Sequence, residues 1–462
     1  MMGKTAPAAA IQEFVIRPLQ EFFRTQAIGG ILLLAASVAA IICANSALSP
    51  LYHRLWEIPF RVSLGEFVVD KTLHHWVNDG LMAIFFFLVG LEIKREVLAG
   101  ELGILKKAVL PISAAIGGMA APALLYAVLN AGGKGLHGWG IPMATDIAFS
   151  LGVLQLLKGR VPFGLLVFLT ALAIADDLGA VLVIALFYGG QIALEPLLFG
   201  GLIVAVSVAL NRAGARTALL YSLLGVALWL AFLNSGVHAS IAGILLAFTI
   251  PTRTTLTAEQ FQRRVRELMG GFGTADGGRG ALERDETQQA IIRQVELAAH
   301  EVEAPLLRIE HNLHPWVTFA IMPLFAFANA GVDISWRALG SALTHPVTLG
   351  VVVGLVLGKQ LGVMLLSWLP VRLGWAELPS GVTWKHLYGV GWLAGIGFTM
   401  SMFIANLAFE EPHLVEQAKI GTLLASLISG VVGYGLLAGG TGVEKRSGGA
   451  IRNSGGGLSS HR

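Results

Sequence analysis

The chain has 462 residues, of which 55% are hydrophobic and only 13% are charged, and its formal net charge is +3. An ordinary soluble domain carries about 25% charged residues, and the deficit here extends along nearly the whole chain. This excludes a soluble domain with a single membrane anchor and predicts an all-α polytopic membrane protein. The single cysteine, Cys43, excludes an intramolecular disulfide and any multi-cysteine metal site.

The N-terminal residues 1–25 contain Arg17 and Arg24 among apolar residues, which favours an amphipathic helix at the membrane surface. A cleaved signal peptide is the alternative, because residues 44–46 resemble a cleavage site, although a long apolar run and a further apolar segment oppose it. Residues 58–71 (IPFRVSLGEFVVDK) alternate between apolar and polar, which predicts a hairpin outside the membrane.

Residues 26–251 and 313–440 contain the apolar segments, each near the roughly 20 residues that a bilayer requires. We expect about twelve transmembrane helices, eight before and four after a polar interruption. The expected spans are about 27–46, 74–97, 107–130, 140–157, 162–188, 195–211, 217–233, 236–251, 315–331, 346–368, 385–408 and 415–439.

The polar stretch 252–312 separates the two groups as a cytoplasmic insert. Its centre, GGFGTADGGRG, has the composition of a flexible linker, and the segment after it (281–313) has the apolar spacing of a helix. The tail 441–462 is rich in Gly and Ser, which is typical of disorder. Lys and Arg gather in the loops of one side, so we expect both termini to be cytoplasmic.

Three carboxylates, Asp146, Asp176 and Asp177, lie inside apolar segments. An ionised carboxylate at the bilayer centre costs about 2.5–3.5 kcal/mol on insertion scales, so such residues usually line an ion or proton path. Asp176 and Asp177 point about 100° apart on a helix and can flank a cavity. Nearby carboxylates resist ionising together, so protons and a hard cation compete for their oxygens, which is the minimum requirement of an antiporter.

Lys359 lies near the middle of the tenth span, and one of the aspartates is its expected partner, although a purely structural ion pair is the alternative. The fourth and eleventh spans contain Gly/Pro-rich stretches (GWGIPMATD and GVGWLAGIGFTMS). Their matching positions within segments 3–5 and 10–12 predict two broken helices, with close helix packing as the alternative for the glycines. Thr145 could satisfy backbone groups that such a break leaves free.

These stretches resemble the NhaA-type sodium/proton antiporters of bacterial membranes. The stretches that carry the resemblance are GLEIKRE (90–96), MATDIAFSLGVL (143–154), ALAIADDLGA (171–180), SGVHA (235–239), HPWV (314–317), PLFAFANAGV (323–332), LGKQLG (357–362) and GIGFTMSMFIA (395–405). The resemblance extends from the N-terminal helix to the last span. It implies inverted repeats with two broken helices that cross at the membrane midplane.

The resemblance also implies residue roles. Asp177 corresponds to the carboxylate that exchanges sodium, lithium and protons, and Asp176 to the neighbour that pairs with Lys359 in one protonation state. Asp146 and Lys359 offset the partial charges of the interrupted helices, and Thr145 is an auxiliary ligand. The sodium site is thus expected at Asp176 and Asp177, and no cofactor is expected.

A further group resembles the family's pH-sensing region. Its members are Glu92, Arg95, Glu96, His238, Glu310, His311 and His314. The alternatives are a solvated helix end for the charged residues and simple helix packing for His238. Asp79 either lines a route to the site or lies near a span end. The insert is longer than expected for the family and leads directly into Glu310, which leaves the pH threshold of this chain open.

We therefore expect an electrogenic, pH-regulated antiporter of the bacterial inner membrane that exports sodium or lithium in exchange for protons. The lipid bilayer and a second copy of the chain are the expected partners, and nucleic acid is not. A sodium-coupled organic solute symporter of the same architecture is the main alternative. An aspartyl protease is disfavoured because no Gly-Asp or Tyr-Asp occurs, a zinc peptidase because His-Glu-x-x-His is absent, and only transport assays exclude a channel.

Overall fold

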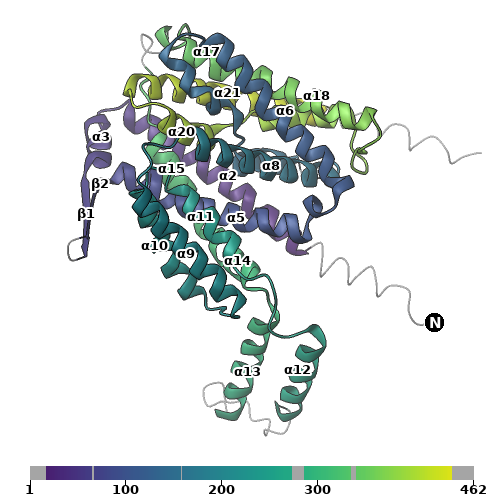
Figure 1. The fold of residues 1–462 in the computed structure, drawn as a ribbon. Helices are drawn as coiled ribbons and strands as arrows, with labels where there is room; N and C mark the ends of the chain where they lie inside the picture. The colour runs from purple at the N-terminus through teal and green to yellow at the C-terminus, as the bar shows by residue number, and fades with distance from the viewer. Residues whose placement is uncertain (1–16, 65–66, 158, 273–285, 335–339, 440–462) are drawn as a thin grey trace, which may run out of the picture. The chain divides into compact units, whose positions relative to one another are not determined.

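The computed structural model describes residues 17–64, 67–157, 159–272, 286–334 and 340–439 of the chain (Figure 1). The chain divides into two compact units. The first contains Met1–His74, Glu101–Tyr188 and Met322–Arg462, and the second contains His75–Gly100 and Gly189–Ile321. Asp146, Asp176, Asp177 and Lys359 all belong to the first unit.

The first unit is built from helices, with one two-stranded hairpin. Its elements are α2 (Arg17–Ala44), α3 (Ser49–Glu57), β1 (Pro59–Leu64), β2 (Phe67–Thr72), η3 (Glu101–Gly103), α6 (Leu105–Leu129), η4 (Lys134–Met143), α7 (Ile147–Gln155), α8 (Phe163–Phe187), α15 (Met322–Asn329), α17 (Pro346–Val353), η6 (Gly354–Gly358), α18 (Lys359–Arg372), α19 (Trp384–Ala394), α20 (Phe398–Ala408) and α21 (Pro412–Gly439). The short helix α4 (Leu73–His75) lies where the two units join along the chain.

The regular elements among the described residues of the second unit are all helices. Its elements are η2 (Trp76–Leu81), α5 (Met82–Ala99), α9 (Leu194–Arg212), α10 (Ala218–Leu233), α11 (Ser240–Thr249), α12 (Ala258–Phe272), α13 (Glu286–Val302), α14 (Pro305–Trp316) and η5 (Val317–Ile321). Helices α12 and α13 lie side by side as a hairpin within the insert (Figure 1).

Helices α6 and α18 of the first unit pack with their backbones in contact. A Cβ added at Gly362 would collide with the carbonyl of Gly117, and one added at Gly358 would lie 2.7 Å from the Cα of Pro122. Small residues at such contacts are typical of helices that associate within a bilayer. This contact fixes the start of α18, where Lys359 lies, against the middle of α6.

The helices confirm an all-α membrane protein, but they do not reproduce twelve uninterrupted spans. Among the described residues, five helices are long and apolar enough to cross a membrane, and seven if each of two bent helix pairs is one span. The other expected spans are short or interrupted: α10 has 16 residues and α11 has 10. Hydropathy averages over a break in the helix, so it predicts a span where the backbone forms two shorter pieces.

The predicted hairpin is confirmed, with β1 antiparallel to β2 and Phe60 opposite Lys71. The helix predicted over 281–313 is divided into α13 and α14, because Pro305 begins α14 and disfavours a helical conformation in the residue before it. Helix α12 was not predicted. The tail, most of the linker and residues 1–16 of the N-terminal segment lie outside the described residues.

Candidate functional site

Two interrupted helices of the first unit meet at their breaks. One break, residues 144–146, separates η4 from α7, and the other, residues 395–397, separates α19 from α20 with a bend of 44°. The amide of Asp146 donates to the carbonyl of Ile396 at 2.7 Å. Gly397 permits this approach, since a Cβ there would lie 3.1 Å from the carbonyl oxygen of Ala144. The broken eleventh segment predicted from its glycines is thus confirmed, and the fourth segment is also interrupted.

Hydroxyl groups from each interrupted helix satisfy carbonyls that the other leaves free. Thr145 and Ser150 donate to the carbonyls of Ala394 and Leu393, each at 2.8 Å. In the opposite direction Ser401 donates to a carbonyl of η4 at 2.7 Å. A break in the helix is tolerable away from water only when its polar groups find such partners. The three hydroxyls therefore hold the two breaks together, and only that of Thr145 was predicted.

Asp146 lies at the N-termini of two helices at once and is completely buried. Its Oδ1 accepts the amide of Phe149 at 2.9 Å, in the first turn of α7. Its Oδ2 accepts the amide of Thr399 at 3.1 Å, in the first turn of α20, together with the Thr399 hydroxyl. A carboxylate is favourable where amide groups and the positive ends of helix dipoles converge. Thr399 was not predicted, although its position just after the Gly-Ile-Gly break in the sequence was a signal.

Lys359 and Asp176 form an ion pair in the interior, with 2.7 Å between Nζ and Oδ2 and 1% exposure of each side chain. Nζ also donates to the carbonyl of Met143, the last residue of η4. The lysine thus lies at the carbonyl end of one interrupted helix, where a positive charge is favourable. The π-helix η6 ends directly before it, and π-bulges of this kind are frequent at functional sites.

Asp177 follows Asp176 on α8 and is completely buried. The second oxygen of Asp176, Oδ1, has no hydrogen-bond partner among the described residues. Among all residues that the structure describes, no three His, Cys, Asp or Glu side chains lie close enough together to hold a metal ion. A cation at these carboxylates would therefore also use hydroxyl or carbonyl oxygens, of the type that Thr145 and Met143 place nearby.

A charged cluster lies separately in the second unit. Arg95 pairs with Glu310 and, at 3.2 Å, with Glu96, and Glu92 interacts electrostatically with the same groups. Burial raises the pKa of Glu310, and Arg95 opposes that rise. Burial also lowers the pKa of His314 to about 4, with His311 and Arg95 acting in the same direction. The structure therefore brings these six predicted residues together, but His314 is neutral above about pH 5.

His238 lies in another part of the second unit, beside a carboxylate rather than in the Arg95 cluster. Its Nε2 is 3.7 Å from Asp79 Oδ1, and its Nδ1 is 2.7 Å from the hydroxyl of Ser240. The other oxygen of Asp79 is 2.8 Å from His75. Asp79 thus bridges two histidines that are far apart in the sequence, which a single sequence does not reveal.

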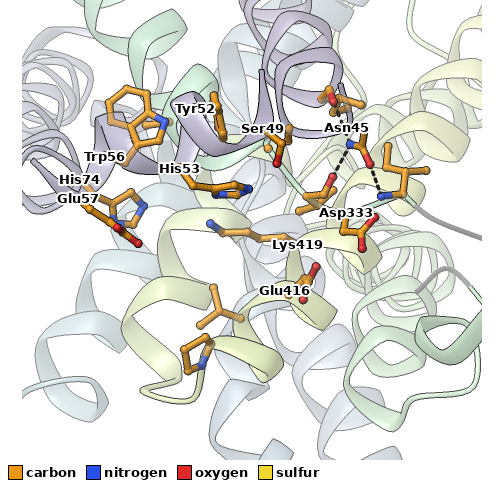
Figure 2. Close-up of a pocket in the computed structure, with 18 of the residues that line it drawn as sticks. Asn45, Ser49, Tyr52, His53, Trp56, Glu57, His74, Asp333, Glu416 and Lys419 are labelled. Atoms are coloured by element: carbon orange, nitrogen blue, oxygen red, sulfur yellow. Dashed lines mark hydrogen bonds between the residues drawn. The ribbon is translucent and has the colours of Figure 1, made fainter. Parts of the chain in front are cut away.

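A cavity of about 1390 Å³ in the first unit lies at the ends of α2, α20 and α21 and in contact with α3 (Figure 2). Asp146, Asp176, Asp177 and Lys359 do not line it. Two of its lining residues are Asn45 and Lys419. The side-chain amide of Asn45 donates a hydrogen bond to the carbonyl of Val332 at 2.8 Å, and Nζ of Lys419 donates one to Oδ1 of Asn329 at 3.4 Å. Figure 2 shows these polar groups beside Asp333 and Glu416. The cavity is therefore distinct from the buried carboxylates.

The chain is similar to known proteins along almost its whole length. The sequence model of the family described as "Na+/H+ antiporter 1" matches residues 20–437. The chain is 48% identical over 425 residues to Na(+)/H(+) antiporter NhaA 2 of Syntrophotalea carbinolica, which covers 92% of this chain and 97% of that protein. It is 50% identical over 439 residues to Na(+)/H(+) antiporter NhaA of Oleidesulfovibrio alaskensis, with 95% and 97% covered. The NhaA of Syntrophobacter fumaroxidans is 48% identical over 422 residues, with 91% and 89% covered.

Proposed function

Because this chain belongs to the Na+/H+ antiporter 1 family, we propose that it exchanges its ions at Asp176 and Asp177. The protein is a sodium/proton antiporter of a bacterial membrane, and sodium and protons are its substrates. The observation that carries the site assignment is the buried Lys359–Asp176 pair beside buried Asp177, where two interrupted helices meet.

The exchange follows from competition for the same oxygens. In the state described here the ammonium group of Lys359 occupies one oxygen of Asp176 at 2.7 Å. A sodium ion that enters releases Lys359 and binds Asp176 and Asp177 in their ionised form, with Thr145 as an auxiliary oxygen. Protons that arrive from the other side neutralise the carboxylates and expel the ion. Removing either charge of a buried pair alone is costly, so the site favours full exchange over an empty, ionised state.

The arrangement around the site supports an inverted repeat. The first three-segment group is α6, η4 with α7, and α8, and the second is α17 with α18, α19 with α20, and α21. Each has an interrupted middle segment, and the two interruptions bond to each other. Asp146 and Lys359 then offset the helix ends that meet at the membrane midplane, within a fold of about twelve transmembrane segments.

We propose five further properties of the protein. Excess Lys and Arg on one side place both termini in the cytoplasm. If more protons enter than sodium ions leave, the membrane potential drives export at about 2.3 kcal/mol per charge per 100 mV. The Arg95–Glu310 cluster and His238 regulate activity with pH, and Glu310 is the titrating group of the cluster, because burial raises the pKa of its carboxyl. Lithium is an alternative substrate, and the β1–β2 hairpin is the proposed homodimer contact.

The test uses inside-out membrane vesicles that are acidified by respiration and contain a fluorescent ΔpH dye. Sodium, lithium and then potassium are added between pH 6 and 9. We expect sodium and lithium to collapse ΔpH in wild type and in Asp70→Asn, which removes an exposed carboxylate on β2. Asp177→Asn, the same chemical change at the buried site, abolishes the response. Full sodium-dependent proton movement in Asp177→Asn would overturn the assignment, and no response in wild type would favour the organic solute symporter.

A further inference from the structure

A second cavity of the first unit, about 710 Å³, lies apart from the exchange site. Its floor is the beginning of α6, including Leu110 and Pro111. One wall is the beginning of α8, from Phe163 to Ala171, and the other is the connection after α18, residues 374–380. The buried carboxylates and Lys359 do not line it.

The connecting segment is an ordered turn that forms one wall of the cavity. Gly374 has a φ of +75°, a left-handed conformation that a residue with a side chain rarely adopts. The amide of Trp375 donates to the carbonyl of Pro370 at 2.9 Å, which closes the turn after α18. The segment also packs on α8, where a Cβ added at Gly164 would lie 3.0 Å from the carbonyl oxygen of Ser380. The cavity is thus a built feature between three elements.

The lining of the cavity combines positive charge with exposed aromatic surface. Lys106 and Lys107 are exposed and occupy the first turn of α6, which contains no acidic residue. Phe163 is 57% exposed and Trp375 is 65% exposed. Glu377 is the one acidic residue of the lining, so the lining is net positive. Aromatic rings exposed at the ends of spans are typical of the interface between the membrane and water.

We infer that this cavity binds an anionic phospholipid, with its phosphate at Lys106 and Lys107 and its acyl chains along Phe163 and Trp375. Basic pockets between the ends of transmembrane helices suit anionic headgroups, since each lysine near a charged membrane surface attracts them. A free phosphate would leave the aromatic walls uncovered, and a cation would meet two lysines. The inference requires the chain to lie in a bilayer, but it does not depend on ion exchange at Asp177.

The test measures lipid contact directly in the purified full-length protein. Detergent micelles receive phosphatidylglycerol or phosphatidylcholine with brominated acyl chains, which quench tryptophan fluorescence on contact. We expect phosphatidylglycerol to quench at lower concentration than phosphatidylcholine, and Trp375→Phe to lose the part of the quenching that is specific to phosphatidylglycerol. Replacing both lysines (Lys106→Gln, Lys107→Gln) lowers the preference by up to about 30-fold, because each contributes about 1 kcal/mol.

Matched variants separate this site from general surface charge. The pair Arg61→Gln and Lys71→Gln removes two exposed positive charges on the β1–β2 hairpin and should leave the preference unchanged. Glu377→Gln should strengthen it. Inorganic phosphate at millimolar concentration should fail to displace the lipid. Size-exclusion profiles identify any variant that does not fold. If the lysine variant does not fold, the loss of phosphatidylglycerol-specific quenching in Trp375→Phe still tests the site.

Four results would overturn the inference. These are equal quenching by the two lipids, an equal loss of preference in the Arg61/Lys71 control pair, unchanged quenching in Trp375→Phe, and full displacement by inorganic phosphate. None of these readings uses transport. A failure of the lipid site is therefore distinguishable from a failure of the proposed exchange site, which the ΔpH measurement detects.

Discussion

Replacing Lys359 by Met tests the buried ion pair that defines the exchange site. Both side chains of the Lys359–Asp176 pair are 1% exposed, and their charged atoms lie 2.7 Å apart. The variant leaves the Asp176 carboxylate buried without its counter-charge. Breaking such a pair by removing one partner costs about 3–5 kcal/mol. We therefore expect the free energy of unfolding of Lys359→Met to fall by about that amount at pH 8.

A double-mutant cycle extends this test. The double variant, Lys359→Met combined with Asp176→Asn, removes both charges of the pair. Replacing a whole buried pair by neutral groups is often close to neutral for stability, so we expect the double variant to recover most of the loss. The free energy of unfolding is measured by SDS titration in mixed micelles for wild type, both single variants and the double variant. The reasoning is refuted if Lys359→Met is as stable as wild type at pH 8, or if the two single costs simply add.

Three further substitutions test the surroundings of the site. Thr399→Val removes the hydroxyl donor to Asp146 and should lower the free energy of unfolding by about 1–3 kcal/mol, while Thr399→Ser keeps the donor and the stability. Gly362→Ala should abolish folded protein on size exclusion because its Cβ collides with α6, while Gly435→Ala, which meets no atom within 4 Å, should not. His314→Gln should leave the pH profile of transport between pH 6 and 9 unchanged, because burial lowers the pKa of His314 to about 4.

The lowered pKa of His314 also predicts how the free energy of unfolding changes below neutral pH. The pKa of His314 in the folded protein, about 4, lies below its ordinary value of 6.5, so the unfolded chain binds more protons between these values. Stability should fall as the pH drops through that window, and His314→Gln should weaken the fall. An alkaline shift of the transport profile in His314→Gln, or an unchanged acid dependence of unfolding, would contradict this interpretation.

Much of the candidate site could be predicted because charge is rare inside apolar segments. Asp146, Asp176, Asp177 and Lys359 stand out for that reason alone, and burial then requires that a lysine find a carboxylate. The structure brings Lys359 to Asp176, as the sequence indicated. Glycine at Gly397 likewise signalled a break, because a side chain there would separate the two interrupted helices.

Other features were not predictable because they depend on contacts between distant segments. Nothing in the sequence around Thr399 indicates that its amide donates a hydrogen bond to Asp146. In the same way, the sequence does not indicate that Asp79 lies between His75 and His238. The continuity of the spans could not be predicted for a different reason. Average hydropathy does not register the breaks and π-helices that divide apolar segments into pieces too short to pass as continuous spans.

The central claim is that sodium and protons compete for Asp176 and Asp177, and the pH dependence of sodium binding tests it most directly. Sodium binding to the purified protein is measured by calorimetry between pH 6 and 9, and the protons released are counted in buffers of different ionisation enthalpy. We expect proton release on binding and, at the acid end of this range, an apparent Kd for sodium that falls about tenfold per pH unit for each proton displaced. Both effects should be absent in Asp177→Asn. Sodium binding of constant affinity across this range, without proton release, would contradict the account.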